Sequence, residues 1–350
     1  MYDIVGKRNW YFAFSAILTV PGLIFILIGG LQPSIDFTGG TEWEVRHASE
    51  PTGVEIQAAL TELGYEEAAV TELSDGFVRI RTEPIDLIPA EPVEPDASGS
   101  PSPDASPAVS PSPDASPAIS PSPSPTPEPV VAGTDFAALQ DDLEDQFGAA
   151  ELRIVRTVGP IIGADLIRSS AILIVVGELF ILAYLWMRFG FRFGTCAIVA
   201  LLHDVILVVG AFAIGGYLFG LEFDALFVTA LLTIIAFSVH DTIVVFDRIR
   251  ENRVRHAGEP FGAIVNHSIL QTLGRSIITS VTVLATLLAL LLLGPDTIRT
   301  FAFALVLGVL SGTYSSIFNA SQLLVAWHEW DAGRKARAGA PGRAVKPLSR

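Results

Sequence analysis

The sequence predicts an α-helical polytopic membrane protein with six transmembrane helices and a small extracytoplasmic α+β domain of ferredoxin-like fold. Half of the 350 residues are hydrophobic and only 17% are charged, which is too apolar a balance for an ordinary soluble domain. Six apolar runs reach the length of roughly 20 residues that a bilayer-spanning helix needs. Acidic residues gather between the first two runs, as expected for an inserted soluble domain.

The first span is predicted at residues 10–31, after a short N-terminal segment at 1–9. It lacks a small-residue cleavage pattern, so we expect an uncleaved anchor rather than a signal peptide. Transmembrane helices 2–6 occupy 166–327, and a basic tail follows at 328–350. Their individual ranges are about 166–187, 194–217, 225–246, 276–293 and 298–327.

Four clusters of basic residues that flank the spans all fall on one side. They are Lys7 and Arg8, Arg188 and Arg192, then Arg248, Arg250, Arg253 and Arg255, and finally the tail from Arg334 to Arg350. The excess of Lys and Arg in cytoplasmic loops places both termini in the cytoplasm and residues 32–165 outside. We also expect these basic loops to contact anionic lipid headgroups.

The segment 32–165 is strongly acidic. It holds 25 Asp and Glu against 5 Arg, a net charge of −20, whereas the rest of the chain has a net charge of +5. This distribution argues against nucleic acid as a partner.

The acidic segment shows the periodicity of a small α+β domain. Strands are predicted at 41–47, 77–82 and 152–157, where short apolar residues alternate with polar ones. Thr52 and Glu55 have the spacing of a capping box before one helix. Thr134 caps a second helix, which stops at Gly148. Strand–helix–strand units of this kind indicate a ferredoxin-like sandwich.

Residues 84–133 interrupt that domain with a stretch rich in Pro, Ser and Ala. The decapeptide PSPDASPAVS at 101–110 recurs at 111–120 with one change, Val109 to Ile119. Such a composition cannot bury a core, so we expect an extended, disordered tether. A proline-rich motif that binds a partner is the alternative.

Three ionisable residues in or beside the spans are the candidates for chemistry. Asp204 lies in the third span, Asp241 in the fourth, and Arg275 begins the fifth. An ionisable residue within a membrane is costly and usually marks an ion path. We expect Asp241 to take and release an ion while Arg275 and Asp204 adjust its affinity. The alternative is a static salt bridge that fixes helix packing.

Histidines precede both aspartates. His240 and His203 can extend a proton path, or each can be an ordinary hydrogen-bonded histidine. Neighbouring residues on a helix point about 100° apart, so these His-Asp pairs do not predict a metal site. The sequence has no phosphate-binding glycine loop, nucleophile elbow or zinc spacing, so we expect no cofactor and no enzymatic activity.

Several motifs together resemble a known family. They are DFTGG at 36–40, VGP at 158–160, HDV at 203–205, SVHDTIVVFDRIREN at 238–252, and the spaced Gln271, Thr272 and Arg275. On these residues the chain resembles the SecF family of protein-export membrane subunits, which with SecD forms a branch of the resistance-nodulation-division superfamily. The resemblance covers about residues 36–324, apart from the proline-rich insertion.

The resemblance implies a subunit of the bacterial plasma membrane that pairs with SecD beside the SecYEG channel. It implies use of the proton gradient, or sodium in some members, to help a translocating preprotein leave the channel. Asp241 is then the essential intramembrane carboxylate, with Asp204 and Arg275 around it. His240 stands where many members carry Asn. Two alternatives remain, namely a small-molecule efflux protein of the same superfamily and a passive membrane assembly scaffold.

Overall fold

The computed structural model describes residues 3–73, 76–85 and 134–338. The predicted tether therefore lies almost wholly outside the described residues, as does the end of the basic tail. The chain divides into two compact units. We call residues 1–38 with 162–350 the membrane unit, and residues 39–161 the sheet unit.

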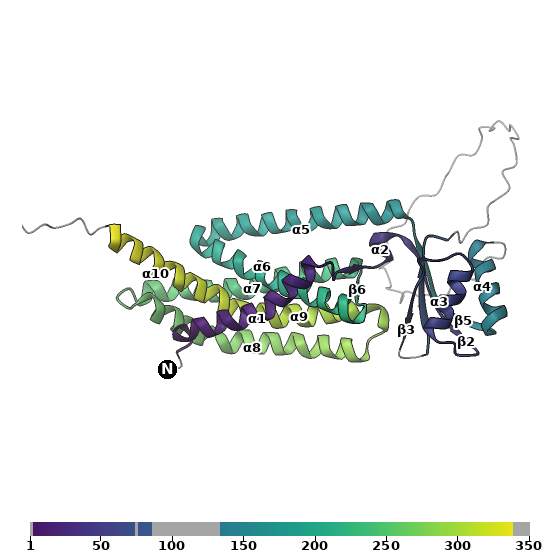
Figure 1. Ribbon diagram of the computed structural model, residues 1–350. Coiled ribbons are helices and arrows are strands. Elements are labelled where there is room, and N and C mark those ends of the chain that lie inside the picture. Colours follow the sequence, from purple (N-terminus) through teal and green to yellow (C-terminus); the bar gives the residue numbers. More distant parts are fainter. Residues whose placement is uncertain (1–2, 74–75, 86–133, 339–350) are drawn as a thin grey trace, which may run out of the picture. The chain divides into compact units, whose positions relative to one another are not determined.

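The membrane unit contains six helical segments long and apolar enough to cross a membrane among the residues that the structure describes, as predicted. The first five are α1 (Arg8–Leu27), α5 (Pro160–Phe189), α6 (Phe191–Phe219), α7 (Ala225–Arg255) and α8 (Phe261–Leu293). The sixth is composite: α9 (Arg299–Ser315), a π-helical segment (Ser316–Ala320) and α10 (Ser321–Ala338). Short 3-10 turns, Val5–Lys7 and Asp296–Ile298, precede α1 and α9. Figure 1 shows these helices running alongside one another.

Helix α8 begins at Phe261, well before the predicted start at 276. Its first half is polar, and interhelical hydrogen bonds stabilise it there: Asn252 of α7 donates to Ser268 at 2.9 Å and to Gln271 at 2.9 Å. Hydropathy detects only the apolar half of the helix. Arg275 consequently lies near the middle of α8 and not at its start.

Close helix contacts depend on glycine at two places. Gly22 of α1 faces Gly210 of α6 so closely that a Cβ on Gly22 would come within 2.8 Å of the Gly210 Cα. A Cβ on Gly308 of α9 would lie 2.2 Å from Ile234 of α7. Gly308 thus lets the sixth span pack closely on α7 inside the bundle.

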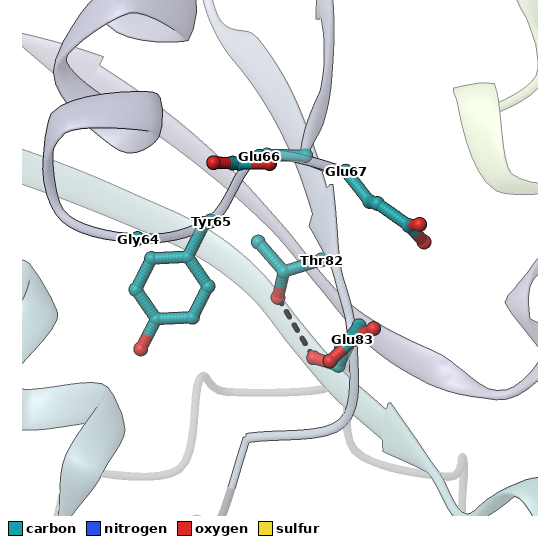
Figure 2. Close-up of a pocket in the computed structure, with 7 residues that line it drawn as sticks. Gly64, Tyr65, Glu66, Glu67, Thr82 and Glu83 are labelled. Atoms are coloured by element: carbon teal, nitrogen blue, oxygen red, sulfur yellow. Dashed lines mark hydrogen bonds between the residues drawn. The ribbon is translucent and has the colours of Figure 1, made fainter.

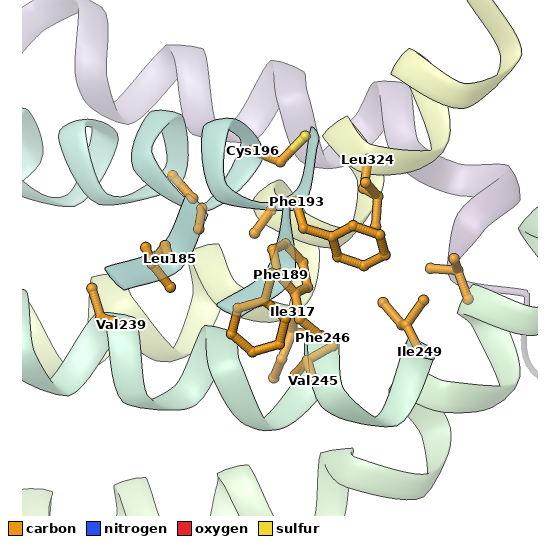
Figure 3. Packing of buried hydrophobic residues seen from close by; sticks show 14 of the residues in the cluster. Leu185, Phe189, Phe193, Cys196, Val239, Val245, Phe246, Ile249, Ile317 and Leu324 are labelled. Atoms are coloured by element: carbon orange, nitrogen blue, oxygen red, sulfur yellow. The ribbon is translucent and has the colours of Figure 1, made fainter. Parts of the chain in front are cut away.

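An aromatic cluster holds one end of the bundle together. Phe246 of α7 packs edge-on against Phe193 of α6 at 5.2 Å and against Phe189 of α5 at 6.2 Å, between ring centroids. Cys196 is buried in the same cluster as a small apolar residue (Figure 3).

Residues 32–38 pair with the loop after α6. Strand β1 (Gln32–Pro33) runs parallel to β6 (Glu222–Phe223), and the one-turn helix α2 (Ile35–Thr38) follows β1. The Asp36 carboxylate accepts a hydrogen bond from the backbone N–H of Ala225 at 3.1 Å. A carboxylate is favourable there because the first N–H groups of a helix, here α7, are unsatisfied.

The sheet unit has the element order β-α-β-β-α-β. Its elements are β2 (Gly40–His47), α3 (Gly53–Glu62), β3 (Ala69–Glu72), β4 (Val78–Thr82), α4 (Asp135–Phe147) and β5 (Ala150–Val158). The strands form an antiparallel sheet in the order β3-β4-β2-β5. This is the ferredoxin-like arrangement, as predicted. Strand β3 was not predicted because it is a short, largely exposed edge strand.

Apolar faces of both helices pack on one face of this sheet. Ile56 and Leu60 of α3 and Phe136 of α4 are buried, and Trp43 of β2 meets Phe136 edge-on at 5.2 Å. The predicted capping box is present, since Thr52 and Glu55 exchange side-chain and backbone hydrogen bonds.

All five arginines of the acidic segment lie on β2, β4 and β5. Glu44 of β2, with a side chain only 1% exposed, accepts from Arg79 at 2.7 Å and lies 2.5 Å from Arg153. Glu42 pairs with Arg156 at 3.0 Å. Arg79, Arg153 and Arg156 therefore neutralise two carboxylates that the sheet buries.

Candidate ion-coupling site

Asp204 is fully buried in the middle of α6 and is surrounded by hydroxyl groups. Ser238 of α7 donates to its carboxylate at 2.6 Å, and Ser311 and Ser315 of α9 donate at 2.6 and 2.5 Å. Ser311 and Ser315 are four residues apart, so they share one face of the helix. Three helices thus meet at one carboxylate, whose desolvation cost these hydrogen bonds offset.

His203 connects Asp204 to α1. Its Nδ1 lies 3.1 Å from the Asp204 carboxylate, and its Nε2 lies 2.5 Å from the Ser15 hydroxyl. Ser15 in turn accepts from the Asn319 amide at 2.8 Å. Since Asn319 donates to Ser15, the hydroxyl proton is available for Nε2, which leaves the ring proton on Nδ1 to face Asp204.

Asp241 has a smaller hydroxyl shell. It is 5% exposed on α7, and its two carboxylate oxygens accept from Ser276 of α8 at 3.0 Å and Ser316 of the π-helical segment at 3.1 Å. Both carboxylates are therefore held by serines of neighbouring helices.

The π-helical segment begins where the two shells meet. Ser315 and Ser316 are consecutive, and one contacts Asp204 while the other contacts Asp241. Ser321 donates its hydroxyl to the Ser316 carbonyl five residues back at 3.2 Å, which satisfies an acceptor of the widened turn. π-Helical turns inside longer helices are frequent at functional sites.

Arg275 and His240 lie apart from these shells. Arg275 is exposed and lines an open cavity of about 620 Å³ with Arg188, Asp247, Arg248 and Glu251. Within the described ranges it makes no ion pair with either aspartate, although its neighbour Ser276 contacts Asp241. The His240 side chain is also exposed and has no hydrogen-bond partner there. The predicted network is thus two serine-bound carboxylates, with Arg275 and His240 outside it.

The sequence matches a protein family over more than half of its length. Residues 138–330 match the family described as "Protein export membrane protein SecD/SecF, C-terminal". The chain belongs to the SecD/SecF family.

Members of the SecD/SecF family match almost the whole chain. It is 42% identical to a "Protein translocase subunit SecF" of Thermobaculum terrenum, over 99% of this chain and 100% of the relative. A "Protein translocase subunit SecF" of Anaerolinea thermophila is 36% identical, over 94% of this chain and 96% of that one.

A longer SecD/SecF relative has been solved. The crystal structure of SecDF from Thermus thermophilus, described as a translocon-associated membrane protein, aligns with a TM-score of 0.73 at 31% identity. The alignment covers 94% of this chain but only 39% of the SecDF chain. This chain thus corresponds to less than half of that protein.

Sequence reasoning missed the serine shells that this SecD/SecF chain builds. The motifs and charged residues of the sequence do not single out Ser276, Ser315 or Ser316. Ser311 and Ser315 lie four residues apart in an apolar helix, and this spacing is the sequence signal that indicates the serine shells.

Glu178 of α5 was also missed. Both of its carboxylate oxygens are buried and have no hydrogen-bond partner among the residues that the structure describes. It shares a helix face with Ile174, Ile181 and Leu185, which pack against the bundle. A charge inside a predicted span was visible in the sequence, and such residues are functional candidates by default.

The sheet unit contains a separate cavity. The sheet unit has a hollow of about 200 Å³ lined by Tyr65, Glu66, Glu67 and Glu83, where the Thr82 hydroxyl donates to the Glu83 carbonyl (Figure 2). Among the described residues, no three His, Cys, Asp or Glu side chains gather closely enough to hold a metal ion.

Proposed function

We propose that this protein is a non-enzymatic, ion-driven subunit of the Sec protein-export machinery, and that Asp241 takes up and releases the driving ion. One observation carries the proposal: the buried carboxylates of Asp241 and Asp204 are hydrogen-bonded by consecutive serines of the sixth span. The family of the chain and its near full-length SecF relatives support the export role.

Ion binding at Asp241 would change the hydrogen bonds that join three helices. An ionised carboxylate only accepts hydrogen bonds, whereas a protonated one also donates. Protonation of one oxygen lets the serine bonded to it, Ser276 or Ser316, turn and accept instead of donating, and a bound sodium ion would reorient the serines in a similar way. Because Ser316 opens the π-helical segment, a change at Asp241 is favourably placed to shift the sixth span.

The partner that best fits the exposed surfaces is SecD. The relative from Thermus thermophilus named SecDF contains a counterpart of this chain within a longer polypeptide. Helices α1 and α5 expose long apolar side chains, including Ile17, Ile24 and Phe180. A SecD helix against α8 would also bring partner groups to Arg275, whose cavity is open.

The wider setting follows from the same proposal. The complex would act beside the SecYEG channel on a translocating preprotein, in the late steps of transport. Both termini would lie in the cytoplasm of a bacterium, with the sheet unit outside and the basic loops at anionic headgroups of the plasma membrane.

Membrane vesicles that contain the chain, SecD and SecYEG test this function. We expect a proton gradient or a sodium gradient, imposed separately, to accelerate release of a preprotein. No acceleration by either gradient would favour a passive scaffold. Intact release together with drug accumulation in cells that lack the protein would favour an efflux role.

A further inference from the structure

The hydrogen bonds around Asp204 extend past the carboxylate through groups that are buried or part-buried. From Asp204 they run through His203 to Ser15 and then to Asn319, with separations of 3.1, 2.5 and 2.8 Å. Three helical segments, α6, α1 and the π-helical segment, contribute to this line. The Ser15 hydroxyl and the His203 ring each donate and accept, which is what proton transfer requires.

Buried side-chain atoms without a hydrogen-bond partner occur at Asn319 and Gln322, at the far end of this series of hydrogen bonds. The Asn319 Oδ1 atom and both polar atoms of Gln322 are buried without a hydrogen-bond partner in the described part of the chain. Gln322 is fully buried, and its position three residues after Asn319 places both side chains on one face. Leaving each atom unpaired would cost about 1–3 kcal/mol.

In protein interiors, buried water molecules offset the free-energy cost of such unpaired atoms, because each water typically bonds two to four otherwise unsatisfied polar groups. Asn319 and Gln322 present three such atoms, from positions three residues apart in the sixth span. His203 Nδ1 lies 3.1 Å from the Asp204 carboxylate, so the ring faces the acid that would receive the proton.

We propose that Gln322 and Asn319 hold buried water that delivers protons through Ser15 and His203 to Asp204. A water molecule gives a proton to Ser15, whose own proton passes to His203 Nε2. The Nδ1 proton then passes to the Asp204 carboxylate, so one proton leaves the water and one arrives at Asp204. His203 regains its starting tautomer when the transfer reverses. This relay rests on the proposed function and makes Asp204 a second proton-binding group beside Asp241.

Time-resolved infrared difference spectroscopy after a pH jump, on the purified full chain with SecD, measures the relay directly. The carbonyl stretch of protonated Asp204 is identified by its loss in Asp204→Asn. We expect His203→Gln and Gln322→Leu to slow the appearance of this band at least about tenfold, without changing its final size. Ser280→Ala is the matched control, since Ser280 is a buried serine that bonds Thr313 at 2.6 Å, away from the line.

Two results would overturn the relay. One is a band that appears at the wild-type rate in both His203→Gln and Gln322→Leu. The other is that Asp204 is never protonated whereas Asp241 is. That result contradicts the relay but leaves the proposed role of Asp241 in gradient-driven release intact. A high-resolution map of the complex gives a second check, because we expect water within hydrogen-bonding distance of Gln322 and Asn319, and a dry site contradicts the relay.

Discussion

Ser315 and Ser316 are adjacent in the chain, yet their hydroxyls bind carboxylates on different helices. Ser315 donates to Asp204 of α6 at 2.5 Å, and Ser316 donates to Asp241 of α7 at 3.1 Å. Consecutive residues of a helix point about 100° apart, which allows one backbone segment to touch both sites. The start of the π-helical segment therefore connects the two buried acids directly through one peptide unit.

This geometry predicts unequal effects of removing the two hydroxyls. Ser316→Ala removes one of the two serines that bind Asp241, whereas Ser315→Ala leaves Asp204 with Ser238 and Ser311. A hydrogen bond to a charged group is worth about 1.5–3 kcal/mol. We expect Ser316→Ala to reduce gradient-stimulated preprotein release at least tenfold and Ser315→Ala to reduce it less. Equal effects would show that the hydroxyls do not act through their own carboxylates.

Close packing of α7 on α9 predicts a stability effect at Gly308. A Cβ there would lie 2.2 Å from Ile234, so Gly308→Ala should destabilise the protein by about 1–3 kcal/mol. Gly274 of α8 is the matched control because its added Cβ meets open space. Denaturation of the detergent-solubilised chain measures both variants, and Ile234→Ala should partly rescue Gly308→Ala. Equal stability of the two glycine variants would contradict the packing.

Removing the charge of Glu178 is predicted to stabilise the protein, in contrast to Gly308→Ala. Its buried oxygens lack partners in the described residues, and the neighbours on its helix face are apolar. Replacing such a group by a side chain of similar size is neutral or stabilising. We expect Glu178→Leu to raise the thermal stability of the isolated chain, with Glu178→Gln between it and the wild type. A less stable Glu178→Leu would mean that the carboxylate is satisfied by a group outside this chain.

The capping box of α3 predicts a pH dependence in the sheet unit. The backbone N–H of Thr52, and then its hydroxyl, hold the pKa of Glu55 below its ordinary value of 4.5. A lowered pKa in the folded state stabilises above the unfolded pKa, and this contribution is lost as pH falls through the folded value. Hydrogen exchange of α3 amides should show Glu55→Gln less protected than wild type at pH 7, with the difference vanishing in acid. Glu62→Gln, an exposed residue at the end of α3, serves as the control.

Features that depend on local sequence were predictable. The six spans follow from apolar runs, and the cap at Thr52 follows from the identity of Glu55 three residues later. The polar first half of α8 was not predicted, because its stability comes from contacts such as Asn252 with Ser268. Strand β3 was missed because an exposed edge strand has little hydrophobic alternation.

The candidate site was predictable only in part. Depth in a span identifies Asp204 and Asp241 from sequence alone. Their serine shells arise from the packing of several helices, and the π-helical turn has no local sequence pattern that specifies it. The outward orientation of Arg275 is likewise set by the rotation of α8, which its neighbour Ser276 fixes by bonding Asp241.

The central claim is that Asp241 couples an ion gradient to export, and Asp241→Asn tests it most directly. Asn keeps the shape of the side chain but cannot carry the charge, so we expect the variant to insert in the membrane and to bind SecD. Glu329→Gln is the control, since Glu329 forms an exposed ion pair with Arg8, a type of pair worth little. In vesicles with SecD and SecYEG, the account predicts that gradient-stimulated preprotein release is lost in Asp241→Asn and retained in Glu329→Gln. Release at the wild-type rate by Asp241→Asn would contradict it.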